Sequence, residues 1–507
     1  MVNSKIKTLD ELQQITTGLK SEGKKVVHCH GVFDLLHIGH IKHFEEARSF
    51  GDVLIVTITP DEYVNKGPGR PAFTTSLRLE ALAALEIVDY VAANQWPVAV
   101  ETIKALRPTI YCKGPDYKNH GDDMTGKIED EEKAVESVGG QIRYTDEITF
   151  SSSSMLNRFG DIFSEEQKTF IKQIVQKYSF DFIVSKINEL KNLKVLVVGE
   201  TIIDQYVFCE ALGKSGKEPV LVLRDLETQQ YLGGVLAIAR HLSGFCNNIS
   251  VLSFIGDKKE HNTFIDENIE ENIKLNLLPK SNSPTIIKRR FLDKVDNKKV
   301  LGVYSINDDP LTEGDETHFL NELDKLVAEH DLVILSDYGH GIITSQVAEY
   351  ISKIDKFISL NAQVNAANIG MHSIRKYHDI NCLIINSSEL RHEMRQREGD
   401  LITLAAELKE TVSADYITVT QGRSGAFLLN NGDIPINCPG FAVDIVDKIG
   451  AGDALLALLS VCLYNKIDEE LGLFIASLAA AQSVESISNS KPVNKVKLLK
   501  TISHSLK

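Results

Sequence analysis

Two histidines beside a glycine turn near the N-terminus have the types and spacing of a nucleotide-phosphate site. The segment GVFDLLHIGH spans residues 31–40 and follows a short apolar run at Val26 and Val27. His37 and His40 are three residues apart, so they share one face of a helix that begins there. A helix N-terminus attracts phosphate, and the two imidazoles add donors for the β- and γ-phosphates of a nucleoside triphosphate. The pattern predicts nucleotidyl transfer, with His37 and His40 stabilising the charge of the transition state.

A second glycine-rich turn lies near the C-terminus and predicts a different phosphate reaction. Residues 447–454 read DKIGAGDA and open an apolar run that continues to Leu459. Small residues at Gly450, Ala451 and Gly452 let backbone N–H groups face the charge on a transferring γ-phosphoryl group. Asp453 stands beside this turn, where a carboxylate can accept the proton of an attacking hydroxyl. The pattern predicts a kinase with Asp453 as general base and the turn as anion hole.

Both motifs need an α/β framework to place them, and the hydrophobic pattern predicts two such frameworks. Strand-like runs alternate with helical spacing over residues 25–160 and again from residue 194 onward, which indicates parallel sheets with crossover helices. The β-like, charged stretches at 200–230 and 285–306 predict a small β subdomain. The expected fold class is α/β, with two doubly wound parallel-sheet domains. The expected boundaries are 1–160, a glycine-free helical stretch at 161–191, and 192–507. The stretch 161–191 is either a connector or a C-terminal helix of the first domain.

Composition narrows the class of partner. Lys plus Arg is 55 and Asp plus Glu is 70 in 507 residues, a formal net charge of −15, which argues against general affinity for nucleic acid or anionic membranes. Seven dispersed cysteines without a CxxC pair indicate buried thiols in a reducing compartment. No run of eighteen apolar residues and no signal-peptide core is present, so a cytoplasmic protein is expected.

The N-terminal segment resembles the HxGH signature of the cytidylyltransferase-like nucleotidyltransferases. The resemblance covers about residues 25–158 and includes the segments 52–56, 69–71, 113–117 and 151–154. It implies nucleotide-binding roles for Gly31, Phe33, Asp34, Lys113, Ser152 and Ser153, and substrate-binding roles for Arg70 and Arg78. Lys66 is either a further phosphate contact or a solvated loop lysine. The segment KGPDY at 113–117 is similar to that of sugar-phosphate adenylyltransferases.

The C-terminal segment resembles the PfkB (ribokinase-like) carbohydrate kinases, because DKIGAGD is similar to their DTxGAGD signature. Five further segments match in the same order along residues 194–500. The resemblance implies sugar contacts from Asp204, Gly233 and Gly234, a weak Mg²⁺ site at Glu389 with Asn386, and ATP contacts from Thr420, Gly422 and Gly425. It also implies Mg²⁺ and ATP as cofactors and allows a homodimer through the β subdomain.

The whole chain resembles the bifunctional heptose kinase/adenylyltransferases of ADP-heptose synthesis, with the order of the two domains reversed. That resemblance adds Lys288, Arg290 and Asp337 as substrate contacts. It implies phosphorylation of heptose 7-phosphate with ATP, and transfer of AMP from ATP to a sugar 1-phosphate with release of pyrophosphate.

Four positions depart from the kinase pattern on its sugar side. Ala237 stands where the family usually has a sugar-contacting asparagine, Asn361 and Gln363 replace an aspartate and a lysine, and His340 replaces a further lysine. A changed sugar accounts for this pattern while the Asp453 motif stays intact. Two alternatives stay open: the same activities on another sugar or a polyol phosphate with CTP, or an active nucleotidyltransferase with a kinase-like scaffold.

Overall fold

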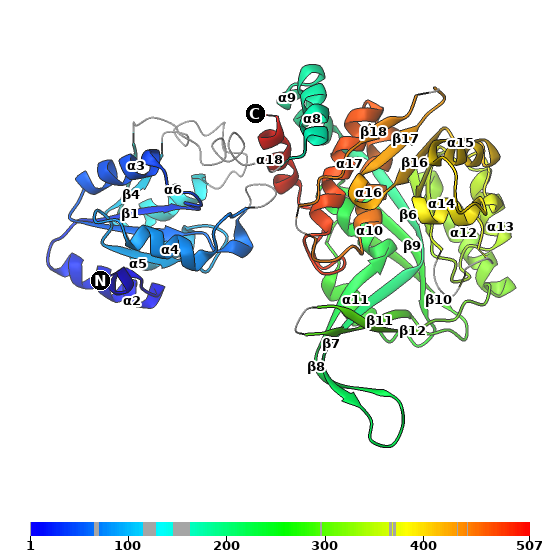
Figure 1. Cartoon of the computed structure of the whole chain (residues 1–507), viewed down its shortest axis with the longest axis horizontal. Coiled ribbons are helices and arrows are strands. Elements are labelled where there is room, and N and C mark those ends of the chain that lie inside the picture. The colour runs from blue at the N-terminus through cyan, green and yellow to red at the C-terminus, as the bar shows by residue number, and fades with distance from the viewer. Residues whose placement is uncertain are drawn as a thin grey trace. The chain divides into compact units, whose positions relative to one another are not determined.

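The chain forms two compact units. The computed structural model describes residues 2–64, 70–114, 128–145, 163–294, 297–364, 368, 372–432, 434–443 and 445–506 (Figure 1). One unit consists of residues 1–164 with 499–507, and the other of residues 165–498. The two phosphate motifs therefore lie on different units, each with a core of its own.

The first unit is built on a parallel sheet of five strands in the order β3-β2-β1-β4-β5. The strands are β1 Val26–Gly31, β2 Val53–Ile58, β3 Tyr90–Ala93, β4 Ile110–Lys113 and β5 Gln141–Tyr144. The chain runs outward from β1 to β3 and then returns to place β4 on the other side of β1. This reversal is a topological switch point, and ligands of such sheets bind outside the carboxyl ends of the strands there. The histidine motif follows the carboxyl end of β1.

Helices cover this sheet, and α2 and α3 begin at side-chain caps. They are α1 Val2–Lys5, α2 Leu9–Ser21, α3 Ile38–Ser49, α4 Thr75–Ala83, α5 Val100–Leu106 and α6 Ile128–Ser137. At the start of α2, Thr8 and Glu11 form a reciprocal capping box. At the start of α3 the cap is His37, whose Nδ1 accepts a hydrogen bond from the N–H of Gly39 at 3.1 Å. The first motif histidine thus fixes the helix that carries the second.

The second unit is built on a nine-stranded sheet in the order β10-β9-β6-β13-β14-β15-β16-β17-β18. The strands are β6 Lys194–Gly199, β9 Asn248–Gly256, β10 Ile273–Lys280, β13 Leu332–Asp337, β14 Phe357–Ala362, β15 Cys382–Asn386, β16 Tyr416–Thr420, β17 Ala426–Leu429 and β18 Ile436–Cys438. Every pairing from β10 to β16 is parallel, and β17 and β18 are antiparallel additions. The polar ends of β13, β14 and β15 consequently meet at one edge.

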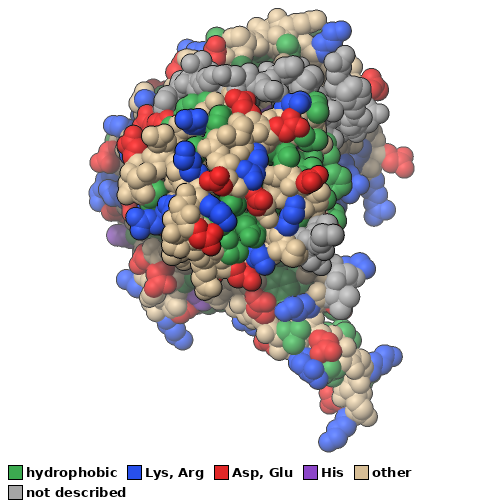
Figure 2. All heavy atoms as spheres, turned by 90° about the vertical axis from the view of Figure 1, so that its left-hand side faces the viewer, with side chains coloured by type: hydrophobic (Ala, Val, Ile, Leu, Met, Phe, Trp, Pro, Cys, Tyr) green, Lys and Arg blue, Asp and Glu red, His purple; other side chains and the backbone are tan. Residues whose placement is uncertain are grey.

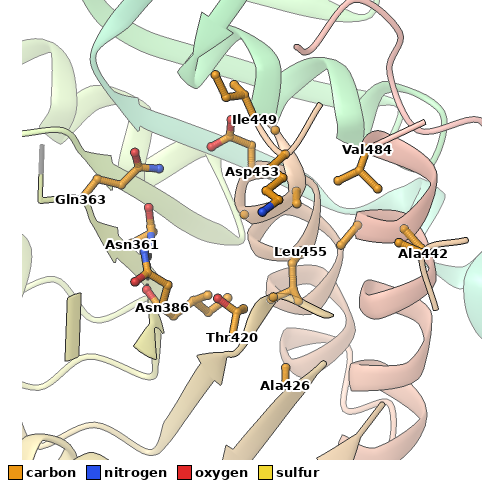
Figure 3. A pocket seen from close by; sticks show the side chains of 18 of the residues that line it. Asn361, Gln363, Asn386, Thr420, Ala426, Ala442, Ile449, Asp453, Leu455 and Val484 are labelled. Carbon is orange, nitrogen blue, oxygen red and sulfur yellow. Dashed lines mark hydrogen bonds between the residues drawn. The ribbon is translucent and has the colours of Figure 1, made fainter. Parts of the chain in front are cut away.

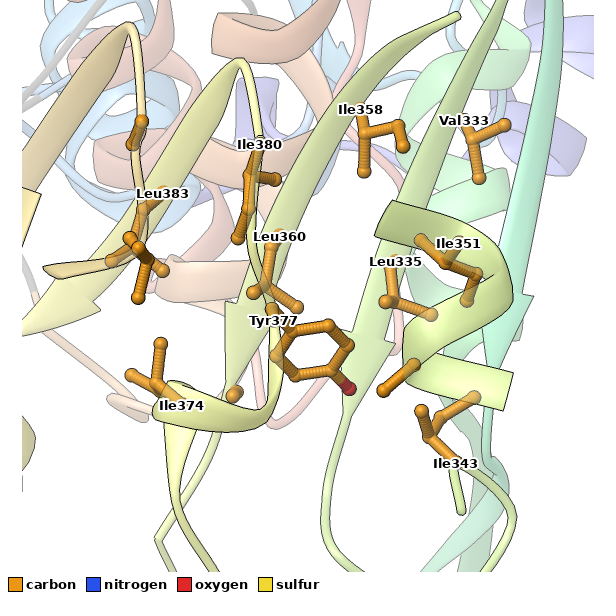
Figure 4. Close-up of a cluster of buried hydrophobic side chains, with 14 of the residues drawn as sticks. Val333, Leu335, Ile343, Ile351, Ile358, Leu360, Ile374, Tyr377, Ile380 and Leu383 are labelled. Carbon is orange, nitrogen blue, oxygen red and sulfur yellow. The ribbon is translucent and has the colours of Figure 1, made fainter. Parts of the chain in front are cut away.

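Helices pack on both faces of this sheet. They are α8 Glu165–Lys177, α9 Phe180–Glu189, α10 Val235–Ser243, α11 Asn262–Asn268, α12 Glu313–Glu329, α13 Ser345–Ser352, α14 Ser387–Glu393, α15 Leu401–Thr411, α16 Ala451–Tyr464 and α17 Glu469–Ser483, with α18 Lys495–Ser505 crossing the division between the units. Figure 4 shows part of one core, in which Leu335 and Leu360 of the strands meet Ile351 of α13 and Tyr377. Helix α16 is buried along its length from Asp453 to Leu463, as expected for a helix that is apolar on all sides.

A separate four-stranded sheet in the order β12-β11-β7-β8 forms the small β subdomain. Its strands are β7 Thr201–Lys214, β8 Leu221–Gly234, β11 Ile286–Asp293 and β12 Lys299–Ser305. β7 and β8 make a long hairpin that projects from the second unit (Figure 1). Residues 201–209 of β7 are buried, whereas residues 210–214 at its far end are exposed. The buried part of the hairpin therefore adjoins the large sheet.

The cysteines are buried, and the charged side chains on the displayed surface are of both signs. All seven cysteines are buried and unpaired. Figure 2 shows Lys and Arg side chains interspersed with Asp and Glu on the face it displays, so charge there is mixed rather than gathered in a basic stripe. Among the described residues, no helix has the length and apolar character needed to cross a bilayer.

The predicted fold class is confirmed for both halves of the chain. Doubly wound parallel sheets form on each unit, and the β-like stretches at 200–230 and 285–306 form the small sheet. The strand pattern did not single out β14, a fully internal strand of the large sheet. Residues 161–191, expected as a helical connector, include α8 and α9, which group with the second unit. The predicted domain boundaries stay predictions.

Replacing Leu335 by Ala is expected to lower the free energy of unfolding of the second unit by about 2–5 kcal/mol, because it opens a cavity in a central strand. Leu335 is fully buried in β13. Urea unfolding followed by circular dichroism measures the change. Leu301→Ala on the exposed strand β12 is the control and should change stability by less than about 0.5 kcal/mol. Equal effects of both substitutions would contradict this description of the core.

Candidate active sites

The turn after β1 is held in a conformation that favours glycine. Phe33 has φ of +45°, which is costly for a bulky residue and occurs where surrounding contacts compensate for it. Its ring packs edge to face with His40 at 5.3 Å between centroids and also contacts Phe44 of α3. A Cβ on Gly31 would lie 2.9 Å from that ring. The turn therefore requires glycine at 31 and anchors Phe33 in the core beneath the helix.

The two motif histidines lie together at the start of α3. Their rings stack with centroids 3.9 Å apart and an interplanar angle of 27°. His37 caps the helix, and His40 sits one turn further on the same face. Two imidazoles at a helix N-terminus form the donor array that nucleotidyl transfer requires. The structure thus brings together the pair that spacing predicted.

Asp34 and Arg70 form a buried ion pair behind the turn. Nη1 of Arg70 lies 2.8 Å from Oδ2 of Asp34, and the N–H of Phe73 donates to the other carboxylate oxygen at 3.1 Å. Both side chains are almost fully buried. This pair joins the motif turn to the segment that begins at residue 70. Asp34 and Arg70, predicted separately as nucleotide and substrate contacts, therefore contact each other.

Arg78 is fully buried in α4 and holds the backbone around the site. Its guanidinium donates to the carbonyls of Phe73 and Val32, and to the carboxylate of Asp61 at 2.5 Å. These bonds tie three loops together. Its substrate-binding role stays a prediction.

Lys113 ends β4 at the switch point and is paired with an acid. Its Nζ lies 2.8 Å from Oε2 of Glu131 in α6, and both side chains are buried. The hydroxyl of Tyr111 donates to the same oxygen at 3.1 Å. Sequence reasoning identified the lysine but missed Glu131, which is 18 residues further along the chain and belongs to no motif. A triphosphate contact by Lys113 requires this ion pair to rearrange or to be shared.

Several buried histidines lie behind the motif. His28 and His30 both contact the Thr57 hydroxyl at 2.8 Å, and burial lowers the pKa of each to about 3. Cys29, His43 and Cys112 each place a possible ligand atom within 4.8 Å of the others. Cys29 and Cys112 are register partners on adjacent strands and belong to the apolar core, and burial raises the pKa of Cys29 well above its usual range. Packing in the core therefore accounts for the burial of both thiols.

Three residues considered for phosphate binding, Lys66, Ser152 and Ser153, lie outside the described residues.

The second unit contains a cavity of about 570 Å³ at the polar edge of its large sheet. Figure 3 shows Asn361, Gln363 and Asn386 on one side of the cavity, with Leu455 and Val484 across from them. Predicted residues that line it come from six separate segments of the chain: Asp204, Gly234, Lys288, Arg290, Asn386, Glu389, Thr420, Gly422, Gly425, Gly450, Ala451, Gly452 and Asp453. Gly233 and Asp337 are predicted residues that do not line it.

Asp453 is a buried carboxylate in the first turn of α16. Its two oxygens accept hydrogen bonds from the Tyr338 hydroxyl at 3.0 Å and from Nδ2 of Asn489 at 3.2 Å. Burial raises the pKa of Asp453 to about 6, although these two hydrogen bonds act in the opposite direction. A carboxylate with this pKa is ionised at neutral pH yet basic enough to accept a proton.

The glycine turn before Asp453 lets neighbouring groups approach its backbone closely. Gly450 has φ of +99°, and a Cβ there would lie 2.1 Å from Oδ1 of Asn489. A Cβ on Gly452 would meet nothing within 4 Å, in keeping with a position that faces the cavity. The free N–H groups of the first turn of α16 therefore border the cavity beside Asp453, as an anion hole requires.

One end of the cavity carries charged side chains from the small sheet. Arg290 and Asp204 form an ion pair, and the Ser488 hydroxyl donates to Asp204 at 3.4 Å. Burial lowers the pKa of Lys288, whose Nζ lies 5.1 Å from the centroid of the Tyr338 ring. A Cβ on Gly233 would lie 2.4 Å from the Asp204 carboxylate, and Gly234 has φ of +59°. The two glycines thus let strand β8 approach Asp204 closely. Gly234 lines the cavity, whereas Gly233 does not.

The other end of the cavity is apolar. Its lining residues include Ala426, Phe441, Ala442, Leu455, Ala480, Ala481 and Val484. Thr420, Gly422 and Gly425 border this region, and Gly425 has φ of +90° with no room for a Cβ beside the Cys438 carbonyl. An apolar region with adjacent polar groups suits a nucleobase.

Asn386 and Glu389 form a capping box at the start of α14 on the cavity wall. The Glu389 N–H donates to Oδ1 of Asn386 at 2.9 Å, and the Asn386 N–H donates to Oε2 of Glu389 at 3.1 Å. Burial raises the pKa of Glu389 to about 7. A bound cation nearby would favour the ionised form of this carboxylate.

Of Asp337 and the four sequence departures, only Asn361 and Gln363 line the cavity. Asp337 is fully buried, and although burial alone would raise its pKa, the Lys376 ammonium at 2.7 Å and His372 hold that pKa below its usual value. Ala237 is buried in α10 and does not line the cavity. Asn361 does line it, and its Nδ2 donates to the Ile384 carbonyl at 2.9 Å. His340 contacts Asp308 at 2.6 Å.

Sequence reasoning missed the two side chains that hold Asp453. Tyr338 directly follows Asp337, which the sequence predicts as the substrate contact, and it is Tyr338 that lines the cavity. Asn489 follows α17 in the stretch SISNS, which matches no catalytic pattern. Only the fold brings it beside Asp453, because 36 residues separate the two along the chain.

Comparisons with known proteins agree with both motifs. A model described as pfkB family carbohydrate kinase matches residues 192–495, and a cytidylyltransferase-like model matches residues 28–159. The chain is 44% identical over 142 residues to the bifunctional protein HldE of Aliarcobacter butzleri, covering 27% of this chain and 29% of that relative. It is 29% identical over 303 residues to HldE of Campylobacter jejuni, covering 58% of this chain and 61% of that relative. The aligned regions thus span less than two thirds of these relatives.

Solved structures agree with the fold of the second unit. Phosphofructokinase-2 from Escherichia coli in complex with potassium aligns with 61% of this chain and 99% of its own, at 13% identity and a TM-score of 0.50. At that identity the likeness concerns the fold alone. The two family matches follow the order that the motifs predicted, with the cytidylyltransferase-like segment first. Because the pfkB family model matches more than half of the chain, this chain belongs to the pfkB family of carbohydrate kinases and carries a cytidylyltransferase-like domain ahead of that kinase domain.

Proposed function

We propose that this chain is a bifunctional enzyme of nucleotide-sugar synthesis. The second unit phosphorylates a sugar phosphate, heptose 7-phosphate, with ATP, and the first unit transfers AMP from ATP to a sugar 1-phosphate. The observation that carries the kinase half is the position of Asp453, a buried base beside a glycine turn in a cavity with one charged and one apolar end. The similarity to HldE supports the pairing of the two activities.

In the kinase reaction the sugar hydroxyl attacks the γ-phosphorus of ATP while its proton passes to Asp453. The bond from the γ-phosphorus to the bridging oxygen breaks, and ADP leaves. Tyr338 and Asn489 orient the Asp453 carboxylate through their hydrogen bonds. The N–H groups at Gly450–Gly452 face the charge on the transferring group. Asp204, Lys288 and Arg290 line the charged end, where the acceptor and its phosphate would bind.

The residues of the cavity wall fit Mg²⁺ bound with a nucleotide. This ion prefers oxygen ligands, keeps several waters and uses one or two protein carboxylates. Glu389 and Asn386 supply a carboxylate and an amide oxygen on the wall, and Glu389 is buried with a raised pKa that a cation would reverse. When bound, the ion would neutralise phosphate charge.

In the nucleotidyl reaction an oxygen of the sugar 1-phosphate attacks the α-phosphorus of ATP and pyrophosphate leaves. His37 and His40 donate hydrogen bonds to the phosphate oxygens from the start of α3, supported by the helix N-terminus. The stacked arrangement of the two rings at the switch point of the sheet supports this role. A phosphatase is needed between the two reactions, because the kinase product would carry two phosphates.

Asp453→Asn is expected to lower heptose-7-phosphate-dependent ATP consumption by about 10²–10⁴-fold, because the general base is lost. Pyrophosphate release from ATP and a sugar 1-phosphate should be unchanged. Coupled assays of ADP and pyrophosphate on the full chain measure both. Asp266→Asn, an exposed carboxylate on α11, is the matched control.

A panel of heptose 7-phosphate, hexose phosphates and free sugars decides the acceptor in the same assay. Turnover with another sugar alone would replace the proposed substrate. No turnover with any acceptor, while pyrophosphate release persists, would contradict the kinase half and favour a scaffold.

The kinase rate should fall as the pH falls through about 6, because Asp453 acts in its ionised form and burial raises its pKa to about 6. The rate at pH 5 is expected to be about tenfold lower than at pH 7. Tyr338→Phe removes a hydrogen bond that lowers the pKa, so its inflection should move to higher pH. Steady-state kcat between pH 5 and pH 8 tests this. A flat profile down to pH 5 would exclude Asp453 as the titrating base.

His37→Ala and His40→Ala are each expected to lower pyrophosphate release by about 10²–10³-fold, through loss of a phosphate donor. Kinase turnover should not change. Because His37 also caps α3, His37→Asn, which preserves a capping side chain, separates catalysis from helix stability. Lys42→Ala, on an exposed position of the same helix, is the control. Full nucleotidyl activity in both alanine variants would contradict the assigned site.

A further inference from the structure

Asp447 connects the small sheet to the glycine turn of the kinase site. Its Oδ1 lies 2.7 Å from the ammonium of Lys299 on β12, and its Oδ2 accepts the Tyr206 hydroxyl of β7 at 2.6 Å. The same carboxylate accepts the backbone N–H of Ile449 at 3.2 Å and that of Ser488 at 3.3 Å. One side chain thus joins two strands of the small sheet to the residues just before Gly450.

An apolar contact next to the Asp447 ion pair also joins the small sheet to the glycine turn. Ile449 packs against a buried cluster of the small sheet formed by Tyr206, Phe208 and Leu292. The turn that leads into the anion hole is therefore attached to the small sheet at two points, Asp447 and Ile449, which are two residues apart. Two attachments restrain the orientation of the turn as well as its position.

The energetic balance at Asp447 depends on its partners in the small sheet. The residue is only 7% exposed, and burial alone would raise the pKa of its carboxyl. Lys299 and Tyr206 outweigh burial and hold that pKa below its usual value. Removing one partner of a buried charged pair leaves the other poorly compensated. Loss of the contacts from the small sheet would therefore leave the Asp447 carboxylate poorly compensated.

The strands that hold Asp447 also carry the charged end of the cavity. Asp204 and Tyr206 are two residues apart on β7 and so share a face. Arg290 of β11 is the register partner of Tyr206, and its guanidinium lies 5.6 Å from the centroid of that ring. The Lys299 ammonium lies 5.5 Å from the same centroid. Tyr206 therefore lies near both ion pairs: Arg290 with Asp204 in the cavity, and Lys299 with Asp447 before the glycine turn.

We propose that Lys299 and Tyr206 are positioning residues through which an acceptor bound at Asp204 and Arg290 organises the anion hole. An acceptor that fixes the small sheet would hold Asp447 and Ile449 in place, and with them the N–H groups of Gly450–Gly452. This inference rests on the proposed kinase function and deepens it, since it states how the same site is regulated. It implies that acceptor and ATP each raise the affinity for the other, because coupling between two sites is reciprocal.

The test compares Lys299→Met with the wild-type chain in ATP binding and turnover. In the wild type, heptose 7-phosphate should tighten the binding of a non-hydrolysable ATP analogue to the kinase unit about fivefold or more, measured by isothermal titration calorimetry. Lys299→Met should lose this tightening and lower kcat about tenfold, while KM for the acceptor changes by less than about twofold. Lys299→Arg, which keeps the charge, should restore most of both. Tyr206→Phe, which removes only a hydroxyl, is the second variant should Lys299→Met fold poorly.

Lys294→Met is the matched control, because Lys294 follows β11 on the same hairpin and its ammonium makes an exposed contact with Glu227 at 3.7 Å. Full acceptor-dependent tightening and unchanged kcat in both Lys299→Met and Tyr206→Phe would overturn the inference. An inactive wild type would instead defeat the proposed function. The dissociation constant for ATP, measured with and without acceptor, would still decide whether Lys299 transmits the coupling.

Discussion

Burial of the Asp453 carboxylate is the constraint around which the kinase site is arranged. Moving a carboxylate out of water is expensive, and it is tolerated only where donors and nearby positive charge compensate. Tyr338 and Asn489 supply the donors, and Lys288 lowers the cost from across the cavity. The apolar helix α16 holds the backbone of this residue in place, because it is buried from Asp453 to Leu463.

The same requirement explains several glycines and distant contacts. Asn489 can reach Asp453 only because Gly450 has no side chain, since a Cβ there would occupy the position of its Oδ1. Asn489 is itself held by His241 at 3.1 Å. A chain of hydrogen bonds thus extends from α10 to the reacting carboxylate. The glycine turn thus has two roles: it leaves room for the side chain that holds the base, and it places N–H groups for the phosphate.

The contiguous motifs were predictable from sequence because their chemistry is local. His37 with His40, and Gly450 with Asp453, each lie within one helical turn, so spacing alone places them together. Lys113 and Asp34 were found, but their partners Glu131 and Arg70 were not assigned to them, since the fold pairs residues from separate elements. Tyr206, Lys299 and Asn489 belong to no motif, and their positions follow only from sheet register and helix packing. Strand β14 was missed because Ser359 and Asn361 interrupt the continuous apolar run that marks an internal parallel strand.

The burial of all seven cysteines leaves the native thiols shielded from reagents in solution. A single cysteine introduced on an exposed position of each unit would then be the site at which a maleimide dye reacts. Two such dyes would report the distance between the nucleotidyltransferase and kinase units during turnover by energy transfer. The chain can thus be labelled for spectroscopy without first removing its own cysteines, which pack in the cores that hold both sites.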